Sequence, residues 1–525
     1  MRQRTRKALE RLGAMGIALA LLCGGAVVGS FAPPAWAASN TKGVLTVGTD
    51  ILSGTTVGPV EFDPAQFTVR EGYTAYDLPI YGGLLRQTPS GAFLPDLASK
   101  VTVPNPSTID LVIRSGAVFS DGTPFTAAAV KAGLERNVAT THQGAFTPYL
   151  FAISSIDQTG TNGLTLNFSQ PVANLFYPYL SDEESFIVSP TAAAAGTLGT
   201  HPVGAGPFML KSYGSDQQIV LVKNPRYWNA KSIHLSGITF VEVPSGPQQV
   251  NALKTGLVNI EEGVPANYIP TLKGPGSLQV KSSFVDGGYY FAPICKSSGP
   301  LAKVQVRQAL SYAVNRPAIN NAILYGEGQP AWSLFPTTNA LYDKSLTGYY
   351  AYDPAKAKRL LAQAGYPHGF STTIMPLPMP SNTQVATILQ AEWKKIGVNV
   401  QIVSTSDYVN DLYVRNKSPI GLNPSGTGGL GKVAGPYTTG SIGDLCNYSS
   451  PALTQLANQA SALPPNSPQL RSVWFQIQQF VIKNALSIYV AFSPTVAAAT
   501  KAVHNVSILP GYIGGVLNYS GMSVS

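Results

Sequence analysis

Short stretches in which apolar and polar residues alternate recur along the chain and predict β-strands. Residues 43–50 form the first of these stretches and end in a turn. Further strands are predicted at residues 108–113, 164–168, 219–222, 238–243 and 398–402. The predicted strands are therefore spread over most of the chain and not gathered in one region.

Segments with apolar residues at helical spacing lie between these strands. Helices are predicted at residues 126–137, 248–254, 385–396 and 472–482, with Thr126 as the cap of the first. In the third, Val385, Leu389 and Trp393 share one face, and Gly397 ends the helix before the next strand. Strands and helices that interleave in this way predict an α/β protein with mixed sheets.

The most clearly bounded helix is predicted between Asp353 and Gly365. The Asp353 side chain can accept from the first free backbone N–H groups, and Pro354 presets the first helical φ. Gly365 can adopt the left-handed conformation that ends a helix.

The N-terminal segment has the organisation of a secretory leader. Five basic residues within residues 1–11 precede an uncharged stretch at residues 12–32 and the site Ala35-Trp36-Ala37. We expect residues 1–37 to be a signal peptide, cleaved before Ala38. A lipid anchor on Cys23 ranks second, because Leu22 stands where a lipobox needs a small residue, and a retained membrane helix ranks third.

Composition narrows the function classes. Residues 38–525 are too many for one compact core and predict two or three subdomains. Part of the formal net charge of +9 lies in the leader, and the rest is spread without a Lys/Arg block, so the charge gives no argument for a nucleic-acid partner. A charged fraction of 12% with 51 Gly and 41 Pro suits a loop-rich exported protein.

Outside the leader the chain holds one pair of cysteines, Cys295 and Cys446. An even number of cysteines in an exported protein favours a disulfide between them. The alternative is two buried free thiols.

Signatures of catalysis, metal binding or cofactor binding are weak. The five histidines are widely separated, and G-x-S-x-G is absent. Residues 426–431 match G-x-G-x-x-G, but no apolar strand precedes them and Gly435-Pro436 prevents a following helix. We expect no catalytic residue, no metal and no cofactor, and interpret this loop as the edge of a binding cleft.

Five segments, in order, resemble motifs of the family 5 extracellular solute-binding proteins, which feed peptide and sometimes nickel ABC importers. Residues 115–130 resemble the R-x-G-V-x-F-x-D-G-x-P-F-T-A-x-D-V signature of that family, and residues 204–228 its G-T-G-P-Y and N-P-x-Y-W hairpin. Residues 252–260, 304–316 and 352–367 are similar to its later motifs.

The resemblance implies a two-lobed periplasmic-binding-protein-like fold with mixed sheets, a hinge and a small inserted subdomain. Lobe I would comprise residues 38–85, 200–289 and 489–525, the inserted subdomain residues 86–199, and lobe II residues 290–488, which include both cysteines. The implied function is that of a monomeric extracytoplasmic receptor that captures peptides or peptide-like molecules in a cleft and delivers them to ABC permease subunits with cytoplasmic ATPases. The alternative is a secreted hydrolase acting on peptides or glycans.

Aromatic residues near predicted loops are candidates for the cleft lining, since rings suit the apolar body of a ligand. They are Tyr73, Tyr76, Tyr289, Tyr290 and Trp332.

One departure from the family bears on the ligand. Peptide-binding members have a G-W-x-x-D-x-x-D-P run whose acid pairs with the α-amino group of the ligand, whereas residues 421–429 here carry Asn423 and Ser425 and no acid. These two residues are further candidates for ligand contact. Burying an ammonium group without a counter-charge is costly. Either another acid among Asp50, Asp63 and Asp286 takes over this role, or the ligand has no free amino terminus, which we favour.

The leader assignment is testable by intact-mass analysis of the protein from its native host. We expect a mature chain that begins at Ala38 and carries no lipid. A diacylglyceryl mass on Cys23 would contradict this expectation.

Overall fold

The structure of this chain is a computed structural model. It describes residues 43–52, 59–67, 73–90, 92–140, 149–214, 218–274, 278–284, 288–295, 297, 299–425, 450–464, 467–509 and 516–525. The predicted signal peptide, Asp286, Cys446 and the glycine-rich loop at residues 426–431 lie outside the described residues, as do the side chains of Tyr289 and Ser425.

A seven-stranded mixed sheet has the order β12-β19-β11-β1-β10-β9-β8. These strands are β12 (Gln279–Ser283), β19 (Thr495–Ala499), β11 (Ile260–Glu262), β1 (Val44–Thr49), β10 (Gly237–Glu242), β9 (Gln218–Lys223) and β8 (Phe208–Tyr213). The central strand β1 is parallel to both of its neighbours, β10 and β11, and the remaining pairs are antiparallel. Leu45 and Val47 of β1 are fully buried in the core.

A second mixed sheet has six strands in the order β14-β18-β13-β17-β15-β16. They are β14 (Gln329–Pro330), β18 (Ser487–Phe492), β13 (Tyr289–Pro293), β17 (Gly421–Ser425), β15 (Phe370–Pro376) and β16 (Val398–Ile402). Here β15 is parallel to both β16 and β17. Each of the two sheets thus contains a parallel group of three strands within an otherwise antiparallel arrangement.

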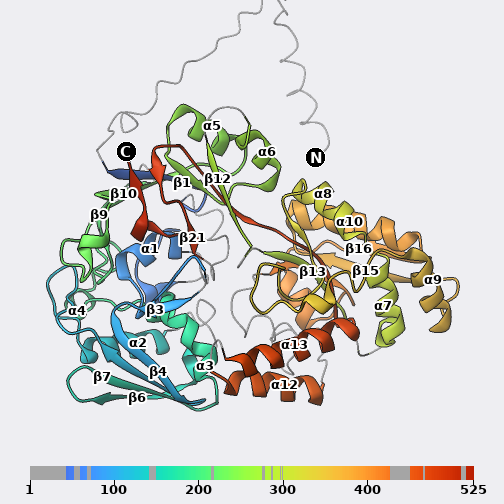
Figure 1. The fold of residues 1–525 in the computed structure, drawn as a ribbon, viewed down its shortest axis with the longest axis horizontal. Helices are drawn as coiled ribbons and strands as arrows, with labels where there is room; N and C mark the ends of the chain where they lie inside the picture. The colour runs from blue at the N-terminus through green and yellow to red at the C-terminus, as the bar shows by residue number, and fades with distance from the viewer. Residues whose placement is uncertain are drawn as a thin grey trace, which may run out of the picture. The chain divides into compact units, whose positions relative to one another are not determined.

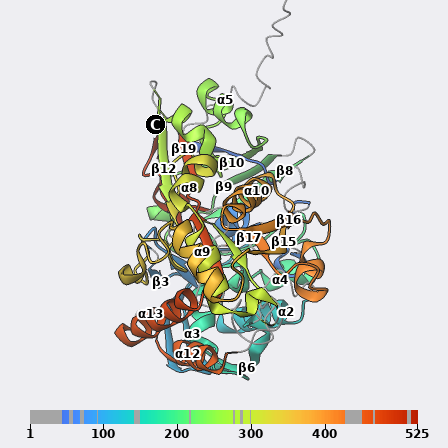
Figure 2. The same cartoon turned by 90° about the vertical axis from the view of Figure 1, so that its right-hand side faces the viewer.

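Helices surround the second sheet (Figures 1 and 2). They are α7 (Val304–Tyr312), α8 (Arg316–Leu324), α9 (Pro354–Gln363), α10 (Pro380–Lys394), α12 (Pro451–Ala462) and α13 (Pro468–Lys483). Helix α9 packs on α7, and α12 packs on α13. Helix α10 connects β15 to β16 and packs against β16. Val385, Leu389 and Trp393 are fully buried, so the face predicted from their spacing is the face that α10 turns to the core.

A third, four-stranded antiparallel sheet has the order β4-β5-β7-β6, formed by β4 (Ala98–Asn105), β5 (Thr108–Ile113), β7 (Gly163–Phe168) and β6 (Ile153–Thr159). It belongs to the long connection between β1 and β10, together with α1 (Thr74–Tyr81), α2 (Ala127–Val138), α3 (Ala173–Phe176) and α4 (Pro190–Ala195). In the remaining connection of the first sheet, α5 (Pro247–Thr255) and α6 (Ile269–Leu272) flank β11.

The predicted strands and helices are confirmed at the positions that the sequence pattern gave them. The sequence analysis found no strand before residues 426–431, but β17 (Gly421–Ser425) ends directly before them, because pairing with β13 and β15 holds this segment extended. The helix bounded by Asp353 and Gly365 is α9, in which Asp353 Oδ1 accepts from the backbone N–H of Lys356 at 2.7 Å. Gly365 has a φ of 87°. Local signals of capping and spacing were sufficient here because both ends of the helix are encoded next to it.

The chain crosses from one of the first two sheets to the other twice, once after β12 and once after β18. The segment after β12 leads into β13, and the segment at Ser493-Pro494 leads from β18 into β19. Strand β18 belongs to the second sheet as far as Phe492, four residues beyond the end at 488 predicted for lobe II. The division into lobes remains a prediction.

One buried cation joins several segments around the second sheet. The guanidinium of Arg316, 2% exposed, donates to five backbone carbonyl oxygens, those of Ser311, Val314, Ala331, Tyr350 and Tyr489, at 2.8–3.4 Å. Burial lowers the pKa of Arg316 to about 10, so the group stays charged at neutral pH. These carbonyl groups come from loops, helix ends and β18, which Arg316 holds together.

Replacing Arg316→Lys should destabilise the protein by about 3 kcal/mol, because an ammonium offers three donors and cannot reproduce the planar fork of the guanidinium. Urea unfolding of the mature chain measures this change, with the exposed Arg359→Lys on α9 as the matched control. A loss below about 1 kcal/mol for Arg316→Lys would show that the carbonyl groups find other donors.

Candidate functional site

The carboxyl ends of parallel strands mark two edges of this fold as candidate binding sites, because loops that leave such strands form the ligand crevice of open α/β sheets. In the first sheet the edge follows β1, β10 and β11. In the second sheet it follows β15, β16 and β17. The two edges differ in charge: the first carries several acidic residues, and a groove beside the second is lined by uncharged residues.

Acidic residues gather at the edge of the first sheet. Asp50 follows β1, Glu242 ends β10, and Glu261 and Glu262 lie on β11. Glu242 Oε2 accepts from the backbone N–H of Leu52 at 2.9 Å. Glu262 Oε1 accepts from the hydroxyl of Tyr519 at 3.1 Å and from the backbone N–H of Leu517 at 3.3 Å.

Glu261 is the most deeply buried of these acids, with 0% of its surface exposed. Gly48 of β1 lies opposite it, and a Cβ at Gly48 would clash with the Glu261 carboxyl group, so the glycine makes room for this side chain. Burial raises the pKa of Glu261 to about 9, a rise that the hydrogen bond from Gln249 opposes and that the charges of Glu262 and Asp50 increase. Glu261 is therefore protonated at neutral pH.

The pKa values of two other acids of this edge, Glu262 and Asp50, shift in the same direction. Burial raises the pKa of Glu262 to about 7, and the hydrogen bond from Tyr519 limits this rise. Burial also raises the pKa of Asp50. Burial thus suppresses the ionisation of Glu261, Glu262 and Asp50, and neighbouring carboxylates add to this effect at Glu261 and Glu262.

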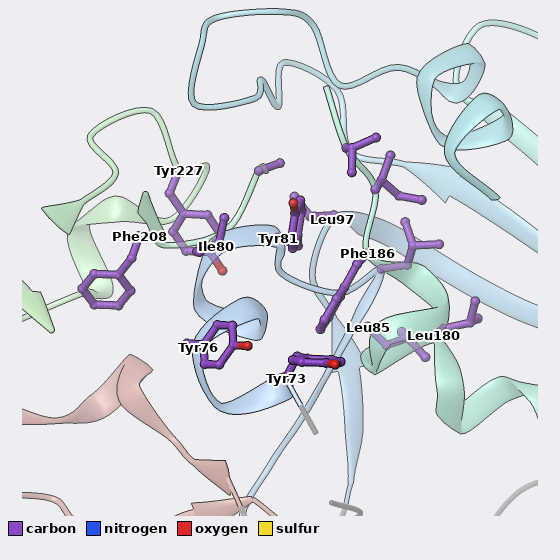
Figure 3. Close-up of a cluster of buried hydrophobic side chains, with 14 of the residues drawn as sticks. Tyr73, Tyr76, Ile80, Tyr81, Leu85, Leu97, Leu180, Phe186, Phe208 and Tyr227 are labelled. Carbon is purple, nitrogen blue, oxygen red and sulfur yellow. The ribbon is translucent and has the colours of Figure 1, made fainter. Parts of the chain in front are cut away.

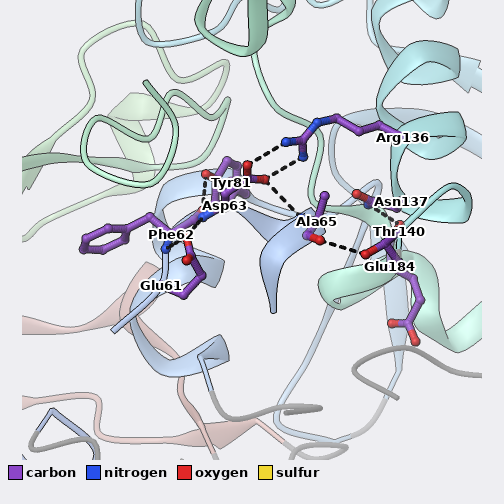
Figure 4. A network of polar contacts seen from close by, with 9 residues as sticks. All are labelled: Glu61, Phe62, Asp63, Ala65, Tyr81, Arg136, Asn137, Thr140 and Glu184. Carbon is purple, nitrogen blue, oxygen red and sulfur yellow. Dashed lines mark hydrogen bonds and ion pairs between the residues drawn. The ribbon is translucent and has the colours of Figure 1, made fainter. Parts of the chain in front are cut away.

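Of the three acids considered as partners for a ligand amine, Asp63 is already paired. Both of its carboxylate oxygens accept from Arg136 at 2.6 Å, and Oδ1 also caps the turn at Pro64–Gln66 through the backbone N–H of Ala65 (Figure 4). Asp50, another of the three acids, directly follows β1 and so lies at the carboxyl ends of the parallel strands of the first sheet.

At the edge of the second sheet, four predicted ligand residues come together on two paired strands. Tyr289 lies opposite Ser425 and Tyr290 opposite Pro424 in the antiparallel pair β13 and β17, and Asn423 lies opposite Phe291. Asn423 Oδ1 accepts from the hydroxyl of Tyr408 at 3.1 Å. The structure therefore joins Tyr289, Tyr290, Asn423 and Ser425, although their contact with a ligand remains a prediction.

The other three predicted residues lie elsewhere. Tyr73 and Tyr76 are only 2% and 1% exposed and pack within an aromatic core around α1 (Figure 3). Trp332 is half-buried, with the Arg316 guanidinium 5.5 Å from its ring centre. Ligand contact by these residues also stays a prediction, but in this structure Tyr73 and Tyr76 are core residues.

Two further predictions concern cysteines and metals. Cys295 is disulfide-bonded, and its pairing with Cys446 stays a prediction because Cys446 lies outside the described residues. Within the described part of the chain, Asp182, Glu183 and Glu184 form the single acidic group whose carboxyl oxygens come within 4.8 Å of one another. All three are buried and engaged in other contacts, so they do not by themselves indicate a metal site.

Sequence reasoning missed a groove beside the edge of the second sheet. The groove has a volume of about 760 Å³. It is lined by Ala322, Ile323, Tyr325, Pro376, Pro378, Met379, Pro380, Thr383, Gln384, Thr387, Ile388, Ser404 and Thr405. The signal that could have pointed to it is the alternation of prolines at residues 376, 378 and 380, which span the connection from β15 to α10.

The buried acids predict a pH-dependent stability. Because the pKa of Glu261 is raised above its unfolded value of about 4.5, the stabilisation is complete below that value and is lost as the pH rises toward 9. Glu261→Gln should remove much of this dependence and raise the free energy of unfolding at about pH 8.5 by on the order of 2 kcal/mol.

Urea unfolding at about pH 5.5 and about pH 8.5 measures the effect. The exposed Glu135→Gln on α2 serves as the control. An unchanged pH slope in Glu261→Gln would mean that the carboxyl is ionised and hydrated in the folded state.

No helix in the described part of the chain is both long and apolar enough to span a bilayer. The model for bacterial extracellular solute-binding proteins, family 5 Middle, matches residues 92–431. Glutathione-binding protein GsiB of Escherichia coli O6:K15:H31 is 30% identical over 407 residues, which cover 76% of this chain and 74% of that protein. Several other GsiB proteins of Shigella and E. coli are matched over about 60% of their length.

Solved structures give the same result. AgaA from A. tumefaciens R10, in complex with agropinic acid, is 26% identical with a TM-score of 0.71, and the match covers 92% of this chain and 99% of AgaA. HbpA2 from Haemophilus parasuis is 21% identical with a TM-score of 0.80, covering 92% and 100%. The predicted periplasmic-binding-protein-like fold with mixed sheets is confirmed, and the motifs, the fold and these relatives agree. The chain belongs to the bacterial extracellular solute-binding proteins of family 5, whose members bind solutes and are not enzymes.

Proposed function

We propose that this protein is the extracytoplasmic receptor of an ABC importer and captures peptides or peptide-like small molecules. As a monomer, it would deliver them to a pair of membrane permease subunits driven by cytoplasmic ATPases. The relative named for glutathione binding supports a peptide-like ligand, since glutathione is a tripeptide. The relative solved with agropinic acid supports a small solute of other chemistry.

The observation that carries this proposal is that each of two sheets has an edge formed by the carboxyl ends of parallel strands. Short segments of chain connect the two sheets. Ser493-Pro494 is one such segment, between β18 and β19. A few residues between two rigid sheets can absorb the changes in φ and ψ that a hinge needs. Closure of two lobes would bury a solute between loops that follow strands of both sheets.

The residues at these edges favour a ligand without a free amino terminus. Residues 421–429 carry Asn423 and Ser425 but no acid, unlike the run that they resemble in peptide-binding members of the family, and Asp63 is paired with Arg136. Asp50 remains as a possible counter-charge, although burial already raises its pKa. Among the described candidates, an ammonium group would have to be compensated by Asp50.

Calorimetric titration of the mature chain with Ala-Phe-Ala and with its N-acetylated form tests the proposal. We expect saturable binding without turnover, and the acetylated peptide should bind at least as tightly as the free one. A preference for the free amine that Asp50→Asn abolishes, and that the exposed Asp157→Asn on β6 leaves intact, would overturn the expectation about the amino terminus.

Mass spectrometry of the titrated peptides separates the receptor from the alternative hydrolase. Intact peptides after prolonged incubation support a receptor. Cleavage products that increase with protein concentration would support the hydrolase instead. Glutathione should be titrated in the same series because of the relative that is named for it.

A further inference from the structure

The groove beside the second sheet is built from three separate segments, residues 322–325, 376–388 and 404–405. Its floor follows the carboxyl ends of β15 and β16, at Pro376 and at Ser404. One wall is the end of α8, and the other is the first turns of α10. A volume of about 760 Å³ lies within the range of pockets that hold small ligands, about 300–1,000 Å³.

The described residues that line the groove include no acidic or basic side chain. Proline, alanine and isoleucine provide much of the surface, and threonine, serine and glutamine provide neutral polar groups. Two large side chains in the lining remain open to solvent: Tyr325 is 54% exposed and Met379 is 45% exposed. An uncharged lining with two exposed large side chains favours an uncharged, largely apolar occupant.

Tyr325 lies in a backbone conformation that a tyrosine rarely adopts. It ends α8 with a φ of 53° and a ψ of 28°, the left-handed region in which glycine is usual at this position. Its ring is exposed, so core packing does not explain why a tyrosine is held there. Residues held in such sparsely populated conformations cluster at functional sites, ligand clamps among them.

The charged groups nearest in sequence to the lining residue Thr405 are engaged with one another. Asp411 accepts from the Thr405 hydroxyl at 2.7 Å and from Arg415 and Lys417 at 2.6 Å and 2.8 Å. Arg415 also contacts Asp407 at 3.1 Å. These contacts link each charge to a partner on the same short segment, which leaves the groove itself neutral.

We propose that the groove lined by Tyr325 and Met379 is a subsite for an uncharged apolar group of the captured solute, aromatic or branched aliphatic. This rests on the proposed function and specifies its ligand class. An apolar group against Met379 and Tyr325 removes both exposed side chains from water, whereas a charged group would lose hydration without gaining a counter-charge.

The first experiment uses Met379 as a reporter and does not depend on peptide binding. The chain contains six methionines, so the ¹³C-methyl methionine spectrum is simple, and Met379→Leu assigns the signal. The probes are N-acetyl-phenylalanine amide and N-acetyl-glutamate amide. We expect the first to shift the Met379 signal saturably and the second to leave it in place. No shift with the first probe, or equal shifts with both, would overturn the subsite.

The second experiment reverses the specificity by introducing a charge. Met379→Glu places a carboxylate at the start of α10, where a negative charge suits the helix dipole and folding should be preserved. We expect the affinity for N-acetyl-phenylalanine amide to fall at least about tenfold and the affinity for N-acetyl-lysine amide to rise. The control Val414→Glu, at an exposed position outside the groove, should change neither affinity.

The outcomes separate this subsite from the proposed receptor function. An unshifted Met379 signal, or equal effects of Met379→Glu and Val414→Glu, would reject the subsite even if Ala-Phe-Ala binds. If the tripeptides and glutathione fail to bind while N-acetyl-phenylalanine amide shifts Met379, the subsite stands and the peptide-like ligand class is rejected.

Discussion

The direction in which a few short strands pair is the constraint on which the candidate sites of this protein depend. Parallel neighbours cannot be joined by a hairpin, so the chain must cross back over the sheet before the next strand begins. In the second sheet, α10 makes this crossing from β15 to β16. In the first sheet, the crossing from β1 to β10 contains the entire four-stranded sheet. Each crossing returns the chain to the same end, so the loops that follow parallel strands meet at one edge.

Burial then gives the two edges different electrostatic character. At the first edge, Glu261 and Glu262 are removed from water, and their pKa values rise because burial penalises the charged form. At the second edge, the groove contains neutral side chains, and the ions of residues 407–417 are paired among themselves. Hydrogen bonds could therefore recognise a ligand at either edge. At the second edge, the groove lining offers no charged side chain with which a ligand could form an ion pair.

How much the sequence could predict depends on how local the signal was. The caps of α9 and the apolar face of α10 are encoded within a few residues, and both were predicted correctly. The pair between Asp63 and Arg136 joins residues that are far apart along the chain, and the burial of Tyr73 and Tyr76 depends on neighbours that no pattern near them reveals. The groove is harder still to predict, because three segments contribute to it and only their packing creates the space.

The neutral lining of the groove bears on how a receptor of this kind could discriminate between solutes. Specificity is a difference between affinities, so a site can gain it by rejecting competitors as well as by attracting its ligand. One additional apolar contact contributes about 1–3 kcal/mol of discrimination, whereas a buried polar or charged group left without a partner costs several kcal/mol. If the groove binds part of the solute as proposed, the absence of acids and bases from its lining would penalise charged solutes more strongly than Tyr325 and Met379 could favour neutral ones. Discrimination at this edge would depend mainly on the missing counter-charges, and the two exposed side chains would set the shape of the group that is accepted.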